Sequence, residues 1–177
     1  MKKNQGIALG LWCALLAAGF SCLAARGQKP MTAVDGSELA KFLMIDLPGY
    51  QSPERPEVKT MDLGEAKVSI AARSFIGETS HLEITIVDGA RLPAADLDFK
   101  SLEKPAFEPG RGKGRKISFQ GFPGVERYAA AEKTAEVLIL VADRFLVDLE
   151  HEDVPDVAAT VRIAGLLDLA GLAALAK

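Results

Sequence analysis

The chain has 177 residues, of which 49% are hydrophobic and 25% are charged. This composition is typical of a folded globular domain and excludes an intrinsically disordered chain. The net charge of −3 and the aromatic content of 6% argue against a nucleic-acid-binding protein, which needs a basic surface or rings for base stacking. We therefore expect no nucleic-acid partner.

The N-terminal segment has the plan of a secretory signal peptide. Lys2 and Lys3 precede an uncharged apolar run over residues 7–24, and the small residues Ala24 and Ala25 close it. We expect residues 1–25 to be a cleaved signal peptide and the protein to be exported to the periplasm or another part of the bacterial envelope. The alternatives are a retained membrane anchor and a buried core helix, because the run has about the minimum length for a membrane span.

Both cysteines, Cys13 and Cys22, lie in this segment. A domain cleaved after residue 25 has no disulfide, thiolate nucleophile or cysteine metal ligand. Cys22 is alternatively a bacterial lipidation site, although Phe20 departs from the small residue usual two positions before an acylated cysteine. A membrane partner is expected only if Cys22 is lipidated or the segment is retained.

Residues 26–33 resemble a tether, and residues 34–177 are expected to form a single domain that begins with a helix. Asp35 and Glu38 have the spacing of a capping box at the start of that helix. Pro48 and Gly49 are expected to end it. Residues 50–57 contain two prolines and are expected to form an exposed connection.

Alternation of apolar and polar residues predicts short strands through the middle of the chain. Turns are expected at Gly77-Glu78 and at Phe122–Gly124, and residues 90–114 are expected to be irregular. The expected strands are Val58–Leu63, Lys67–Phe75, Leu82–Ile86, Ile117–Gln120 and Val125–Ala131.

Residues 134–150 have the pattern of a central hairpin. Val137–Ala142 is an uninterrupted apolar run, which predicts a strand covered on both faces. After Asp143-Arg144, apolar residues alternate with polar ones, which predicts a partner strand covered on one face.

The C-terminal residues have helical periodicity. Asp153 and Pro155 are expected to start one helix, and Asp168 is expected to cap a second. A helix, antiparallel strands and two more helices define an α+β order. Because 137–142 should be buried on both sides, we expect an antiparallel sheet of about six strands with helices packed on both faces.

Two charged stretches are candidate contact surfaces. The Gly-rich segment 109–116 carries Arg111, Lys113, Arg115 and Lys116, which could bind an anion or a partner protein. It is not a P-loop, because no Gly-Lys-Ser/Thr is present and a strand follows where a helix should hold the phosphate.

The second stretch is the acidic end of the hairpin: Asp148, Glu150, His151, Glu152 and Asp153. Carboxylates bind hard cations, and a histidine can act as a metal ligand or a general base. The spacing matches neither an EF-hand loop nor His-Glu-x-x-His, so a solvated strand end is the simpler interpretation. No Gly-x-Ser-x-Gly is present, and we expect no catalytic residue, cofactor or metal.

Three short motifs, Gly121–Val125, Asp143–Val147 and Asp168-Leu169 with Leu172, resemble small bacterial envelope proteins whose architecture is similar to the PsbP/Mog1-like αβα sandwich. The resemblance covers roughly residues 35–175. It implies an antiparallel sheet between helices and a binding or accessory role, such as assistance to photosystem II or to a small GTPase. It implies no catalytic residue, and no motif links the chain to either of those partners.

These patterns together predict an exported, non-catalytic binding or accessory protein of the bacterial envelope, with an unknown envelope partner. The alternative is a small ligand- or metal-binding protein, or an enzyme, that uses the acidic residues and His151 at 148–153.

Overall fold

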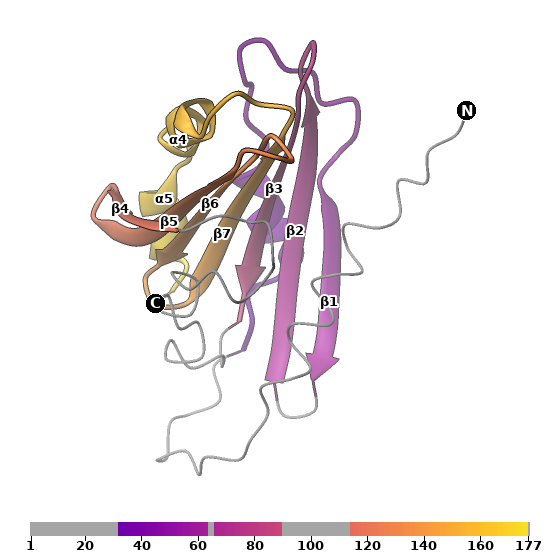
Figure 1. Ribbon diagram of the computed structural model, residues 1–177. Helices are drawn as coiled ribbons and strands as arrows, with labels where there is room; N and C mark the ends of the chain where they lie inside the picture. Colours follow the sequence, from indigo (N-terminus) through magenta and orange to yellow (C-terminus); the bar gives the residue numbers. More distant parts are fainter. Residues whose placement is uncertain (1–31, 64–65, 90–113, 177) are drawn as a thin grey trace. The chain divides into compact units, whose positions relative to one another are not determined.

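A computed structural model describes residues 32–63, 66–89 and 114–176, all within a compact unit that spans residues 31–177. The described residues form a seven-stranded antiparallel sheet and three short helices (Figure 1). This arrangement confirms the α+β class. The sheet has seven strands rather than about six.

The strands lie side by side in the order β1-β2-β3-β7-β6-β5-β4. Each neighbouring pair is antiparallel. Two runs of consecutive strands, β1–β3 and β4–β7, therefore meet where β3 pairs with β7. The bounds are β1 Glu57–Leu63, β2 Ala66–Ile76, β3 His81–Asp88, β4 Arg115–Phe119, β5 Phe122–Ala129, β6 Thr134–Val141 and β7 Phe145–Glu152.

The register assigns each side chain to one of two faces, because residues directly opposite each other in neighbouring strands point the same way. One row across the four central strands consists of Ala71, Ile86, Val147 and Ile139. These four residues belong to the main buried cluster. We call their side of the sheet the helix face and the other side the outer face.

All three described helices pack on the helix face. Helices α2 (Gly36–Lys41), α4 (Ala158–Ala164) and α5 (Leu169–Ala174) contribute Leu39, Ile163 and Leu172, respectively, to the same buried cluster. The described part of the chain places no helix on the outer face, where a second helical layer was expected. Helical periodicity identifies these segments, but it carries no information about which face of a sheet they cover.

The central hairpin is confirmed as β6 and β7, but the expected one-sided burial of the second strand is wrong, because residues on both faces of β7 are buried. Leu138 and Leu140 face the outer side and Ile139 faces the helices, and all three are buried. The turn uses Ala142 and Asp143, which both have positive φ (53° and 52°), and it is closed by the Arg144 N–H bonded to the Val141 carbonyl at 3.1 Å. The expected apolar run therefore ends one residue earlier, because Ala142 belongs to this turn.

Several element ends differ from the expected ones. Helix α2 ends at Lys41, and the apolar residues Leu43 and Leu47 are buried in the non-helical segment that follows it. Asp35 caps the helix by accepting from the Ser37 N–H at 2.8 Å, whereas Glu38 pairs with Lys41 instead of completing a capping box. Apolar spacing thus predicted burial correctly but overestimated the length of the helix.

The turn between β4 and β5 was also misplaced. Gln120 and Gly121 have φ values of 51° and 87° and form the turn, whereas Phe122–Gly124 begin β5. Pro123 does not prevent this, because proline is tolerated at the start of a strand.

The C-terminal helices differ in how well their starts were predicted. Asp168 caps α5 as expected by accepting from the Gly171 N–H at 2.8 Å. Helix α4 begins only at Ala158, whose N–H donates to the Asp156 carboxylate, and Asp153 lies in a turn with φ of 57°.

A buried ion pair ties the beginning of the described domain to the central hairpin. The Asp88 carboxylate is fully buried, and it accepts from Arg144 Nη2 at 2.8 Å and from the Val34 N–H at 2.6 Å. Arg144 also donates to the Thr32 carbonyl at 3.0 Å. Residue 32, expected in the tether, is therefore bonded to Arg144, and residue 34, expected as the first residue of the domain, is bonded to Asp88 of β3.

Candidate functional site

The predicted acidic and histidine cluster lies on β7, and the strand divides it between two faces. Asp148, Glu150 and Glu152 alternate onto the outer face, whereas His151 points to the helix face and has no exposed surface. Asp153 follows the strand and is exposed. Strand alternation therefore separates the histidine from the carboxylates that neighbour it in sequence.

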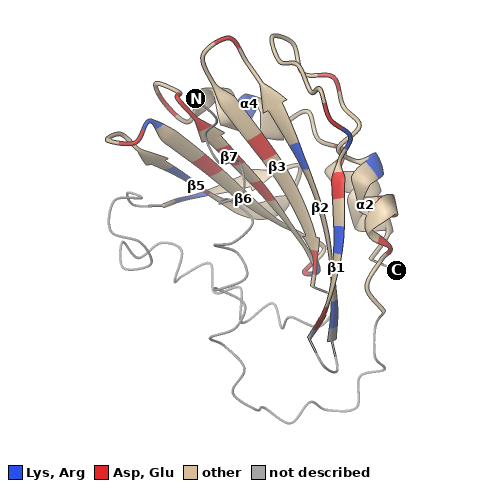
Figure 2. Cartoon of the chain, turned by 90° about the vertical axis from the view of Figure 1, so that its right-hand side faces the viewer, with Lys and Arg blue, Asp and Glu red and all other residues tan. Residues whose placement is uncertain are grey.

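The outer face brings together carboxylates that are distant in sequence. Glu83 of β3 lies directly opposite Glu150 of β7, which in turn lies opposite Glu136 of β6. Figure 2 shows acidic residues on the neighbouring strands β3, β7 and β6. We call Glu83, Glu150 and Glu136 the acidic row. Glu83 and Glu136 were not among the predicted site residues, because only the strand register shows that they adjoin Glu150.

Cations lie near the acidic row. Arg127 of β5 is opposite Glu136, and its Nη2 lies 2.6 Å from a Glu136 carboxylate oxygen in a nearly buried ion pair. At the other side, His81 lies 3.9 Å from Glu152, with both side chains well exposed. The row therefore has a buried cation at its β5 end and a titratable group beside its β3 end.

The carboxyl of Glu83 is perturbed. Partial burial raises the pKa of Glu83, and the charges of Glu57 and Glu152 add to this effect, whereas His81 opposes it. The raised pKa of Glu83 thus comes from burial and from the charges of Glu57 and Glu152, whereas Glu136 at the β6 end of the row is paired with Arg127.

A second polar cluster surrounds His151 on the helix face. Its Nε2 is 2.8 Å from the Tyr50 hydroxyl, and its Nδ1 is 3.0 Å from the Thr160 hydroxyl of α4. The Tyr50 hydroxyl is also 3.2 Å from that of Ser80. Burial lowers the pKa of His151, and the charge of His81 lowers it further. Tyr50 and Thr160 could not have been assigned to this cluster from the sequence, because they lie on elements whose packing was unknown.

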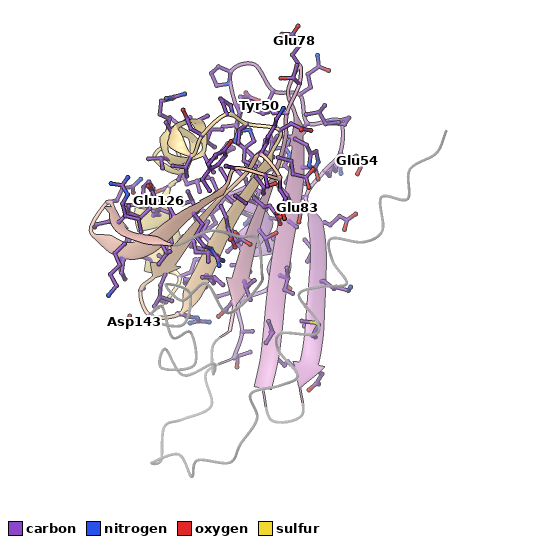
Figure 3. The ribbon with its side chains drawn as sticks, viewed as in Figure 1. Tyr50, Glu54, Glu78, Glu83, Glu126 and Asp143 are labelled. Atoms are coloured by element: carbon purple, nitrogen blue, oxygen red, sulfur yellow. The ribbon has the colours of Figure 1, made fainter. Side chains whose placement is uncertain are left out.

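The basic stretch does not form one continuous described surface. Arg111 and Lys113 lie outside the described residues. Arg115 points to the helix face of β4, where its Nε donates to the buried carboxylate of Glu126 at 2.8 Å, whereas Lys116 points to the outer face. Figure 3 labels Glu126 on the β5 side of the sheet, apart from Glu83.

Other predicted features fall outside the described residues, among them Cys22 and the rest of the expected signal peptide. No helix within 32–63, 66–89 or 114–176 is long and apolar enough to span a membrane. In the same ranges, no three His, Cys, Asp or Glu side chains converge as they would around a metal ion.

No protein-family model matches the chain, and comparison with curated proteins and with solved structures gives no match either.

Proposed function

We propose that the protein is an exported, non-catalytic binding or accessory protein of the bacterial envelope and that it contacts a cationic segment of its partner through the outer face of the sheet. The acidic row is the observation that carries this proposal. Three carboxylates in directly opposing positions give this part of the outer face an acidic character, even though Glu136 is paired with Arg127, and an acidic surface attracts a cationic segment of a partner.

The position of the row also supports a contact role. Glu83 and Glu150 are partly exposed, and the neighbouring Glu152 and His81 are well exposed. The described helices all lie on the opposite face, so none of them covers the row. Glu136 is only 7% exposed, so Glu83 and Glu150 are the members of the row that a partner strand or loop carrying Lys or Arg would contact.

Export remains part of the proposal and is supported by the sequence of residues 1–25. The likeness to a PsbP/Mog1-like αβα sandwich is also retained as a proposal. It is supported by the order of helix, antiparallel strands and helices, whereas the described residues supply only the helical layer on one face.

The test of the acidic row is binding of a partner recovered from the native envelope to the full-length protein and to the double variant Glu83→Gln/Glu150→Gln. We expect the affinity to fall by about tenfold or more, because each lost charge removes part of the attraction. The affinity for the wild type should also fall as salt is raised.

The matched control is the double variant Glu132→Gln/Asp143→Asn, which removes two exposed charges from turns of the sheet. It should bind as the wild type does. Equal binding by the Glu83/Glu150 variant, or equal weakening by both variants, contradicts a specific role of the acidic row.

The four cations Arg111, Lys113, Arg115 and Lys116 are a second proposed contact surface. The side chains of Arg115 and Lys116 project from opposite faces of β4. We therefore expect charge reversal at Arg115 and charge reversal at Lys116 to weaken partner binding to different extents. If reversal of all four charges leaves the partner fully bound, this surface has no role.

A further inference from the structure

His151 has a fully buried, ionisable side chain at the end of β7. On the helix face it lies between Leu82 of β3 and Ala135 of β6, and Thr160 of α4 covers it. Tyr50 reaches it from the connection between α2 and β1. Figure 3 shows Tyr50 at the end of the sheet opposite to the Asp143 turn.

We propose that His151, Tyr50 and Thr160 form an acid-sensitive latch, in which protonation of His151 releases helix α4 and the segment around Tyr50 from this end of the sheet. The latch is separate from the acidic row, because its side chains lie on the helix face.

The geometry suits a neutral imidazole. A neutral ring has one donor and one acceptor nitrogen, and the hydroxyls of Tyr50 and Thr160 can satisfy either kind. A second proton would place a full charge in a site that has no exposed surface. Such a charge requires a counter-ion or water to offset the cost of burial.

The elements packed around the ring supply no counter-ion among the described residues. The groups facing it are hydroxyls from the Tyr50 segment and α4, with Ser80 behind Tyr50, and apolar side chains from β3 and β6. Arg162, two positions beyond Thr160, is exposed and lies on a different side of α4. The neighbours Glu150 and Glu152 point to the outer face, where Glu152 lies beside His81.

The direction of the pH effect follows from the lowered pKa of His151, which is caused first by burial and then by the charge of His81. An opened or unfolded chain has an ordinary histidine with a pKa of about 6.5. Between that value and the lower folded pKa, the open form binds more protons. Acidification below about 6.5 therefore favours opening, and the latch is fully closed above it.

The two segments held by the latch have little stability of their own. Helix α4 has seven residues, and a helix of that length is marginal without tertiary contacts. The Tyr50 segment is held on its other side by the pair of hydrogen bonds between Gln51 and Ile76 (2.8 and 2.7 Å). Loss of the His151 bonds therefore loosens α4 first.

The test combines NMR titration with amide hydrogen exchange on the full-length protein. The chain has only two histidines, so the variant His81→Gln assigns both ring signals. We expect His151 to stay neutral well below pH 6.5. The opening equilibrium constant of residues 158–164 and 48–52, obtained from exchange rates corrected for intrinsic exchange, should rise as the pH falls below 6.5. The rise should approach about tenfold per pH unit, which is the maximum for opening coupled to the uptake of one proton. Exchange in the middle of β6 and β7 should change much less.

The variant His151→Gln keeps polar contacts in the cluster but cannot be protonated, and it should lose this pH dependence, whereas His81→Gln should keep it. The proposal is overturned if His151 titrates with an ordinary pKa while α4 stays protected, or if His151→Gln retains the acid response. The wild-type titration alone decides the matter if His151→Gln does not fold.

Discussion

At the scale of single residues, the buried ion pair between Arg144 and Asp88 should be highly sensitive to substitution. The variant Arg144→Met leaves the Asp88 carboxylate buried without its cation, and we expect the free energy of unfolding to fall by about 3–5 kcal/mol. Urea denaturation measures the loss.

The control is Arg162→Met, which changes an exposed arginine of α4 and should cost no more than about 0.5 kcal/mol. The double variant Asp88→Asn/Arg144→Met should recover part of the loss, because no unpaired charge remains. Equal effects of the two single variants would show that the buried pair contributes no more than a surface side chain.

The raised pKa of Glu83, caused by burial and by the charges of Glu57 and Glu152, is testable in the absence of a partner. Its raised pKa means that the folded state binds the proton more tightly than the unfolded state. The wild type therefore loses stability as the pH rises from below the ordinary pKa of the carboxyl through the raised value. The variant Glu83→Gln lacks this carboxyl and should not lose stability in this way. The difference between its melting temperature and that of the wild type should therefore increase between pH 4 and pH 7, as calorimetry can measure. If the difference in melting temperature between the variant and the wild type stays constant across this range, the pKa of Glu83 is not raised.

The candidate site was only partly predictable at this scale. The alternation of β7 follows from its sequence, and it already implies that His151 and Glu150 face opposite sides. The pairing of Glu83 with Glu150 joins residues 67 positions apart and depends on the β3–β7 register. No local pattern in the sequence contains that register.

At the scale of elements, the β6–β7 turn contains a strained residue. Ala142 has φ of 53°, a left-handed conformation that costs a residue with a Cβ about 1 kcal/mol or more. We expect Ala142→Gly to relieve this strain and to stabilise the protein by a few tenths to about 1 kcal/mol, because glycine also loses more entropy on folding. Chemical denaturation measures the gain.

Ala130→Gly, in the exposed turn that follows β5, is the comparison for Ala142→Gly, because Ala130 does not have positive φ. That change should be neutral or destabilising. If Ala142→Gly and Ala130→Gly both destabilise the protein, the substitution at Ala142 relieves no strain in the β6–β7 turn.

Helices and strands were predicted with different success. The seven strands occur close to where alternation placed them, because burial of one or both faces dictates that pattern. The helix after Asp35 was predicted too long, since Leu43 and Leu47 reach the core from a non-helical segment. The spacing of apolar residues indicates which side chains are buried. Both a helix and the observed non-helical segment can bury side chains at this spacing.

At the scale of the whole molecule, the predicted export is open to a direct measurement. When the full-length gene is expressed in a bacterial host, we expect the protein in the envelope fraction to begin at Ala25 or Arg26. Mass spectrometry of the intact protein gives this end. An acylated Cys22 would identify a lipoprotein, and an unprocessed Met1 would contradict cleavage. The control is a variant with Lys2 and Lys3 replaced by Glu, which should slow processing.

The face on which the helices pack could not be obtained from the sequence. Leu138 and Leu140 correctly indicated burial on the outer side, but burial alone does not specify a helix as the cover. The α+β class was predictable because it depends only on the kinds of element, whereas the layers depend on contacts between distant segments.

The strand order has a consequence for how the chain folds. The runs β1–β3 and β4–β7 are each meanders whose neighbouring strands are close in sequence, so both can assemble by closing short loops. The seam between β3 and β7 must instead bring together positions more than 55 residues apart. We expect this seam to limit the folding rate, since long-range pairing comes at a larger entropic cost than hairpin formation. Substitutions along the seam should slow refolding, whereas those in the outer hairpins should chiefly hasten unfolding.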